Sequence, residues 1–133
     1  MAHNSNIDNA KYESLKSSFE NIMHLINISL GNIAFNNLSF KNKNNQELTY
    51  SETYVPKFHP TIFEAISAAF LYASKHINLS KYDFSKLKEQ HIELLNNEDF
   101  KDAISNRTTN LENIKKRITL ATKYLFNLNY DWK

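Results

Sequence analysis

The chain contains no cysteine, one glycine and two prolines among its 133 residues. Without cysteine there can be no disulfide framework, no thiol catalysis and no zinc site with cysteine ligands. A single glycine cannot build a glycine-rich phosphate loop. So few chain-breaking residues argue for long helices and against a sandwich or barrel of short strands.

Long hydrophobic runs and a strong excess of one charge are also missing. No apolar stretch approaches the ~20 residues that span a bilayer, and residues 1–6 lack the basic and apolar regions of a signal peptide. We therefore expect a cytoplasmic protein with no membrane association. The 16 basic and 14 acidic residues nearly balance, which gives no general attraction to nucleic acid. The 41% share of hydrophobic residues is sufficient for a globular core.

Apolar residues at steps of three and four predict a first helix over residues 9–30. Its stripe consists of Tyr12, Leu15, Phe19, Ile22, Met23, Ile26 and Leu30. Gly31 follows at the point where a helix end favours a positive φ. Residues 1–8 are expected to be a flexible arm or a remnant added for expression, and residues 9–133 a single helical domain.

Residues 36–57 follow a different pattern. Two stretches with alternating polarity, 38–40 and 48–55, flank an Asn- and Lys-rich run at 41–46. This arrangement predicts either a short β-hairpin or an ordered loop that lies over the helices.

Three more helices are predicted in the middle of the chain. Pro60 opens the second helix, because a proline is well tolerated at the first helical position. The broad apolar face of this helix predicts a central, buried position. A third helix is expected to start near Asp83 or Ser85 and to end at Asn96, and a short fourth helix follows with Asn97 as its N-cap.

The last helix has the clearest signature. Thr109 and Glu112 have the spacing of a capping box, and an apolar stripe follows, made of Leu111, Ile114, Ile118, Ala121, Leu125 and Leu128. The stripe either packs into the domain's own core or forms a seam for a partner helix. The whole pattern predicts a mainly α fold, a single-domain bundle of about five helices.

Patterns that indicate catalysis or metal binding are missing from the sequence. The five histidines form no H-x-x-x-H or H-E-x-x-H pair, so we predict no metal site. There is also no G-x-S-x-G nucleophile elbow. We therefore expect that this chain is not an enzyme and needs no cofactor.

One carboxylate lies on the most apolar helix. Glu64 neighbours Phe63 and Ile66 on the same helix, so its charge requires a partner if it is buried. We predict that Arg117 is that partner, with Arg107 as the alternative, because a planar guanidinium suits a partly buried ion pair. The pair would tie the second and last helices together. A buried acid/base site is the functional alternative.

Basic residues gather towards the C-terminal end of the chain. The candidates for contact with nucleic acid are Lys101, Arg107, Lys115, Lys116 and Lys123. Such residues on an exposed helix face are either ordinary solvated side chains or a phosphate-binding surface. DNA binding by the last helix is therefore an alternative function.

Several short motifs together resemble the C-terminal helical region of a large bacterial protein family. They are FHPTIFEA at 58–65, FKDAI at 100–104, Thr108, and Arg117 followed by Ile118, with a Gly-x-x-Ala-Phe step at 31–35. The N-terminal domain of that family is ParB/sulfiredoxin-like and carries an Asp-Gly-Gln-Gln-Arg motif. Its members include the GmrSD-type modification-dependent restriction proteins.

The resemblance implies a role in DNA-targeting restriction or phage defence. The Asp-Gly-Gln-Gln-Arg motif of the nuclease domain does not occur in this sequence, and His59 replaces an asparagine of the family pattern. The chain therefore looks like a non-catalytic helical domain that packs against a catalytic domain or a partner subunit, including a second copy in a homo-oligomer. The polar positions that match the family pattern are Glu64, Thr108 and Arg117.

Overall fold

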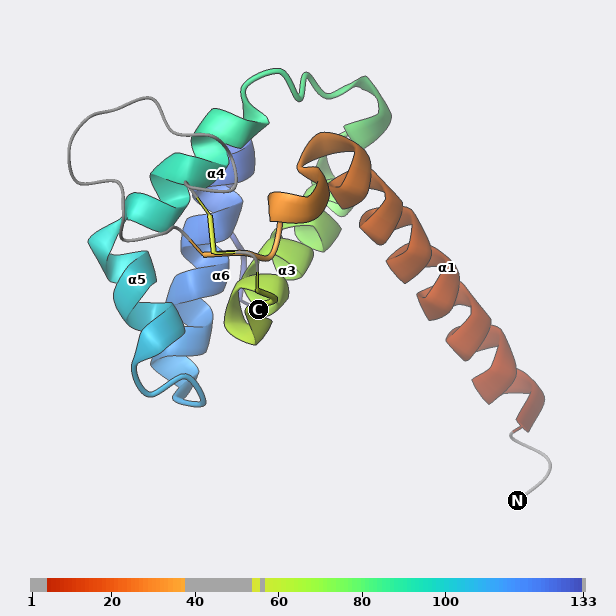
Figure 1. The fold of residues 1–133 in the computed structure, drawn as a ribbon. Coiled ribbons are helices and arrows are strands. Elements are labelled where there is room, and N and C mark those ends of the chain that lie inside the picture. Colours follow the sequence, from red (N-terminus) through yellow and green to blue (C-terminus); the bar gives the residue numbers. More distant parts are fainter. Residues whose placement is uncertain (1–4, 38–53, 56, 133) are drawn as a thin grey trace.

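The structure, a computed structural model, describes residues 5–37, 54–55 and 57–132 (Figure 1). The elements in chain order are α1 (Ser5–Ser29), the 3-10 turn η2 (Gly31–Ile33), α3 (Pro60–His76), the 3-10 turn η3 (Leu79–Lys81), α4 (Leu87–Asn96), α5 (Glu98–Ser105) and α6 (Leu111–Phe126). Within these residues there are five α-helices and no strand, which confirms the predicted mainly α fold. The predicted hairpin or ordered loop falls largely on residues 38–53, outside the described part of the chain.

The central element of the fold is α3, as predicted. It packs against α1 on one side and α6 on the other, and α6 also packs against α4 and α5 (Figure 1). The buried face of α3 consists of Ile62, Ala65, Ile66, Ala69, Phe70 and Ala73. Several of these residues are small, and small residues let the neighbouring helices approach α3 closely.

The structure corrects the predicted start of α1 and confirms its predicted end. The helix begins at Ser5, before the predicted start at residue 9, so part of the segment expected to be an arm is helical. At its other end, Gly31 has a φ of 66°, the left-handed conformation expected just after a helix.

The boundaries of α4 and α5 follow from local hydrogen bonds. α4 begins at Leu87, later than Asp83 or Ser85. The Asp83 carboxylate accepts a hydrogen bond from the amide of Ser85 at 3.0 Å, which holds a turn ahead of the helix. Asn97 caps α5 as predicted, because its side chain accepts from the amide of Phe100 at 2.9 Å.

The start of α6 corrects the predicted capping box. The N-cap is Asn110, whose side-chain oxygen accepts from the Glu112 amide at 2.8 Å, so Thr109 lies outside the helix. Asparagine is the stronger N-cap residue of the two. At the other end, Asn127 has a φ of 55° and ends the helix, which leaves Leu128 beyond it.

The C-terminal tail folds back on the helices. The indole N–H of Trp132 donates to the Thr119 hydroxyl on α6 at 2.9 Å. Tyr130 stacks on Tyr72 of α3 with ring centroids 4.6 Å apart, and the Tyr72 hydroxyl donates to the carbonyl of Asn129 at 2.9 Å. The tail therefore lies against α3 and α6 of its own chain.

The N-terminal part of α1 projects away from the other helices (Figure 1). Every residue from 10 to 20 is exposed, whereas Ile22, Ile26 and Leu30 further along the same stripe are buried. The apolar stripe of α1 is therefore covered only in its C-terminal half. Of the helices described, none combines the length and the apolar character that crossing a bilayer requires.

Candidate functional site

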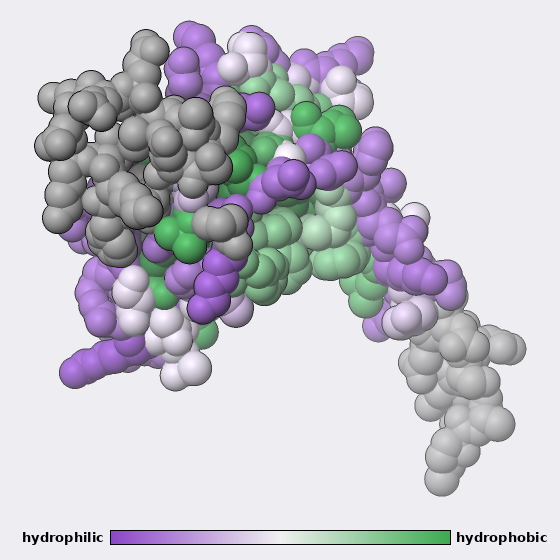
Figure 2. Space-filling model, in the orientation of Figure 1, coloured by the Kyte–Doolittle hydropathy of each residue, from purple (hydrophilic) through white to green (hydrophobic). Residues whose placement is uncertain are grey.

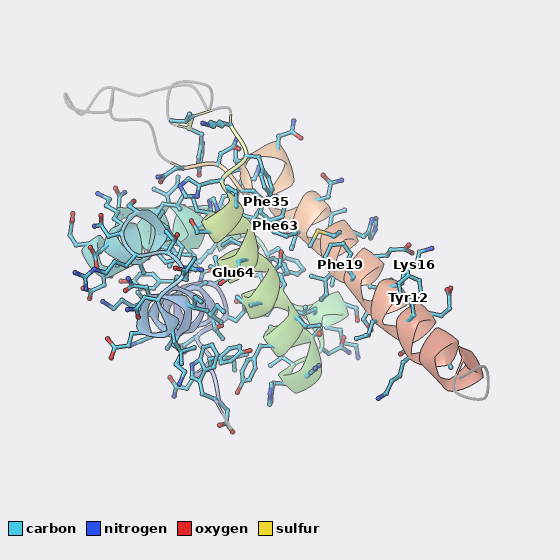
Figure 3. The ribbon with its side chains drawn as sticks, turned by 90° about the horizontal axis from the view of Figure 1, so that it is seen from below. Tyr12, Lys16, Phe19, Phe35, Phe63 and Glu64 are labelled. Carbon is cyan, nitrogen blue, oxygen red and sulfur yellow. The ribbon has the colours of Figure 1, made fainter. Side chains whose placement is uncertain are left out.

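Arg117 and Glu64 form the predicted ion pair between α6 and α3. The Nη2 and Nε groups of Arg117 both donate to Glu64 Oε1, at 2.9 and 3.1 Å. The Arg117 side chain is only 2% exposed, whereas that of Glu64 is 44% exposed. Figure 3 shows Glu64 on the side of α3 that faces α6. The carboxylate thus covers a guanidinium that is otherwise inside the protein.

The remaining nitrogen of the guanidinium holds the connection between α5 and α6. Arg117 Nη1 donates to the carbonyl oxygens of Ala103 at 3.1 Å and Thr108 at 2.8 Å. Thr108 contributes its main-chain carbonyl to this contact. Because the N–H groups of a guanidinium point in fixed directions, one side chain can join a carboxylate to two carbonyls. Arg117 thereby ties α3, α5 and α6 together.

Thr61 makes a second link between α3 and the end of α5. Its hydroxyl donates to the carbonyl of Ile104 at 3.1 Å and lies 2.9 Å from Nδ1 of His59. The hydroxyl has one proton, so the His59 ring must donate through Nδ1–H in this arrangement. Burial and the positive charge of Lys57 lower the pKa of His59, in agreement with a neutral ring.

The polar cluster of Glu64, Arg117, Thr61 and His59 links helices to one another. Apart from the local contact of Thr61 with His59, its hydrogen bonds run from one helix to another helix or to the turn between α5 and α6. Among the described residues, no group of three or more His, Asp or Glu side chains is placed to hold a metal ion. Because the hydrogen bonds of Arg117 join α3, α5 and the turn before α6, the geometry supports the structural role predicted for the pair.

Sequence reasoning missed a buried histidine on α4. His91 is fully buried, and its Nε2 lies 3.1 Å from the carbonyl of Ala34, while its Nδ1 lies 3.5 Å from the hydroxyl of Tyr54. Burial lowers the pKa of His91 to about 4, so the neutral ring donates through Nε2–H to Ala34. Its spacing from Leu87 and Leu94 on the buried face could have revealed it.

Two of the basic residues predicted to contact DNA interact with neighbouring side chains. Lys101 on α5 pairs with Glu98 at 3.5 Å. The ammonium of Lys115 lies 5.7 Å from the ring centroid of Trp132, within the range of a cation–π contact.

The other three predicted DNA-contacting residues are exposed. Arg107 belongs to the connection between α5 and α6 and has a φ of 44°. Lys116 and Lys123 are seven residues apart on α6, so they lie on the same side of that helix. These two lysines are the part of the basic set that a phosphate backbone could meet together.

An apolar groove lies between α1 and α3. It has a volume of about 340 Å³ and is lined by Leu15, Ser18, Phe19, Ile22, Ser67, Ala68 and Leu71. Figure 2 shows apolar surface in the angle between the projecting part of α1 and the other helices. The hydroxyl oxygen of Ser67 is buried there and has no hydrogen-bond partner among the described residues. We call this feature the α1–α3 groove.

Aromatic side chains extend the apolar surface towards the start of α3. Phe63 is four residues before Ser67, on the same face of α3 as Leu71. Its ring contacts Phe35 with centroids 4.9 Å apart and Phe58 with centroids 5.4 Å apart. Phe35 and Phe63 lie side by side in Figure 3. The groove therefore continues a line of apolar residues along α3.

Comparison of the chain with protein-family models, with curated proteins and with solved structures finds no match. The polar cluster holds helices together, whereas the α1–α3 groove leaves apolar surface without a cover.

Proposed function

We propose that this chain is a non-catalytic helical interaction domain that binds another polypeptide in the α1–α3 groove. The observation that carries the proposal is the exposed apolar stripe of α1 beside that groove. Tyr12, Leu15 and Phe19 are 62%, 70% and 51% exposed. A contiguous exposed apolar surface of this kind commonly marks a site of protein–protein interaction, and a groove beside a helix suits an amphipathic helical partner.

The lack of packing along the projecting part of α1 supports the same conclusion. Isolated helices shorter than about 12–15 residues are marginally stable in water, and most helical stability in proteins comes from packing of the apolar face. In α1, residues 10–20 are all exposed, so little of this packing is present in that half of the helix. A bound partner would supply it.

We further propose a setting for this interaction from the motif resemblance. In a bacterial ParB-like protein that acts in DNA-targeting restriction or phage defence, the partner would be the catalytic domain or another subunit, in the cytoplasm. The matching segments 58–65 and 100–104 meet around Arg117, through Glu64 and Ala103. Their proximity supports treating them as one structural unit. In this proposal the polar cluster maintains the fold and the groove makes the contact.

A photocrosslinking amino acid tests the proposed contact. Benzoylphenylalanine in place of Leu15 should give a discrete covalent adduct after irradiation in cells that express the chain. The matched control is the same replacement at Leu111, an apolar residue of α6 with a similar exposure of 63%. Equal labelling at both positions, or none at either, would contradict the proposal.

DNA binding by α6 is the alternative function, and it is favoured by the exposure of both Lys116 and Lys123 on one side of the helix. Such binding should weaken steeply with salt, because each phosphate contact releases counterions. A gel shift with duplex DNA at two salt concentrations measures this. The variant with both lysines changed to glutamate should lose the shift. A chain that causes no shift at low salt would exclude this alternative.

A further inference from the structure

The exposed stripe of α1 and the wall of the α1–α3 groove share residues. Leu15 and Phe19 belong to both. If the projecting part of a second α1 enters the groove, a two-fold axis places the first α1 in the groove of the second copy. This is the self-complementarity required of an isologous dimer interface.

We propose that the partner in the α1–α3 groove is a second copy of this chain, with the two α1 helices packed antiparallel about a two-fold axis. This proposal rests on the proposed function, since it names the partner of the same groove. Each α1 then contacts both α1 and α3 of the other copy, so that four helices form one packed layer.

The exposed apolar area is of the size that a dimer needs. Tyr12, Leu15, Phe19 and Leu71 are 62%, 70%, 51% and 39% exposed. A fully exposed aromatic side chain presents about 200 Å² and a leucine somewhat less, so these four residues present roughly 400 Å² of apolar side chain. A standard interface buries about 800 Å² per partner, and more than half of it is apolar. The stripe therefore supplies the apolar centre, and the polar residues beside it supply the rim.

The sequence of α1 fits an antiparallel register. A two-fold axis that passes near residues 17 and 18 of both α1 helices places Leu15 of each copy beside Phe19 of the other. The same register brings Lys16 of each copy within about one helical turn of Glu20 of the other, since one turn rises 5.4 Å. Lys16 flanks the apolar stripe next to Tyr12 and Phe19 (Figure 3). Opposite charges would thus meet along both edges of the pair.

The floor of the groove suits a closely packed helix. Ser67 and Ala68 are small residues of α3 in the lining, and small residues permit the shorter distances in the usual 8–10 Å range between helix axes. The buried Ser67 hydroxyl has no partner among the described residues. The hydroxyl of Tyr12 from the second copy is the polar group of the stripe that can reach this layer.

Sedimentation equilibrium of the whole chain tests the dimer. We expect the wild type to dimerise at micromolar concentration, and Leu15→Glu to weaken dimerisation at least tenfold, because the change places a charge in the apolar centre. Leu111→Glu is the matched control, and it should dimerise like the wild type. A wild type that stays monomeric up to about 100 µM, above the range of a micromolar dissociation constant, would overturn the proposal.

Charge reversal and crosslinking test the antiparallel register. Lys16→Glu should weaken the dimer, and adding Glu20→Lys to it should restore the dimer. The chain has no cysteine of its own, so Ser18→Cys near the axis should form an intermolecular disulfide, whereas Ser14→Cys should not. Equal crosslinking at both positions indicates a parallel pair, which would overturn this register, because the two Cα atoms must approach within about 7 Å.

The photocrosslinker at Leu15 separates the two levels of the proposal. An adduct with the mass of two chains supports the second copy as partner. An adduct with a different protein, together with a monomeric chain in sedimentation, rejects the second copy and leaves the proposed interaction function standing. Labelling no greater than at Leu111 rejects both.

Discussion

α1 and α6 have apolar stripes of the same spacing, but the protein buries them to different extents. In α6, Ile118, Ala121 and Leu125 are all buried. In α1, the stripe is buried only from Ile22 onward, and the preceding residues from 10 to 20 are exposed. The spacing of apolar residues therefore predicts a helix and its apolar face, but it does not predict which protein surface covers that face.

The difference follows from the neighbours of each helix. α6 packs against α3, α4 and α5, whereas α1 packs against α3 with its C-terminal half (Figure 1). α6 is also fixed by Arg117, whose hydrogen bonds reach α3 and the α5–α6 connection. The sequence allowed a partner seam on the last helix. In the structure, more of the exposed large apolar residues lie on the first helix than on the last, where Leu111 is the exposed one among those described.

Removal of the Arg117 side chain should have the largest effect on stability. Arg117→Ala leaves the carbonyls of Ala103 and Thr108 without their donor and Glu64 without its counter-charge. Leaving a buried carbonyl without its donor typically costs about 1–3 kcal/mol in the free energy of unfolding, and Arg117→Ala does so at two carbonyls. Glu64 adds less to the loss, because its carboxylate is 44% exposed and can be hydrated. Urea denaturation followed by circular dichroism measures this loss. Lys116→Ala, at the exposed neighbouring position, should change stability by less than about 0.5 kcal/mol.

A double-mutant cycle sharpens the same prediction. Because Glu64 and Arg117 are in direct contact, the losses caused by Glu64→Ala and Arg117→Ala should not add. We expect a coupling of about 1–3 kcal/mol between contacting residues. Additive losses would show that the ion pair does not hold α3 and α6 together, and that Arg117 acts only through its carbonyl contacts.

The same substitution in the two stripes compares them directly. Leu125→Ala empties a fully buried position in α6, and such changes typically cost about 3 kcal/mol. Leu15→Ala changes an exposed position in α1, and it should cost less than about 0.5 kcal/mol when unfolding is measured on the monomer at high dilution. Equal losses at the two positions would mean that the isolated chain already covers the stripe of α1.

Lower pH should loosen the attachment of α1. His91 bonds the Ala34 carbonyl just after α1, and burial lowers its pKa from 6.5 to about 4. The stabilisation is therefore complete above pH 6.5 and is lost as the pH falls towards 4, because the unfolded chain binds the proton first. The loss should reach about 3 kcal/mol at pH 4.

Thermal melts between pH 7 and pH 4 measure this dependence. The melting temperature of His91→Gln should depend less on pH than that of the wild type. The difference between the two profiles is the contribution of His91 to the pH dependence. His59 also has a lowered pKa, so the variant should retain part of the slope. His24→Gln, at an exposed position of α1, should follow the wild type. Parallel profiles for the wild type and His91→Gln would rule out this role of His91.

Local signals in the sequence predicted the helices and one long-range contact. Pro60, Gly31 and Asn97 mark helix ends by their own backbone chemistry, and the structure confirms all three. The pairing of Glu64 with Arg117 was predictable because an isolated charge on an apolar helix requires a counter-charge.

Features that depend on competition or on distant contacts were not predictable in this way. Asn110 displaced Thr109 as the cap of α6 because two adjacent residues compete for the same amides. The burial of His91 depends on Ala34 and Tyr54, which are far away in the sequence. The exposure of residues 10–20 in α1 was not predictable, because the spacing of apolar residues continues unchanged into the buried half of the helix. Only the tertiary arrangement shows that α1 diverges from α3 (Figure 3).

The smallest free energy that we expect is that for local opening of residues 10–20 in α1, and amide hydrogen exchange measures it. In the Leu15→Glu variant, which we expect to be monomeric, the amides of residues 10–20 should exchange with an opening free energy near zero, because no tertiary packing holds that part of α1. The central amides of α6, around Ala121 and Leu125, should exchange only on global unfolding. In the wild type at a concentration that favours the dimer, the protection of residues 10–20 should rise while that of α6 changes little. If residues 10–20 of the monomeric variant were protected as strongly as α6, the proposal that a partner stabilises this part of α1 would be contradicted.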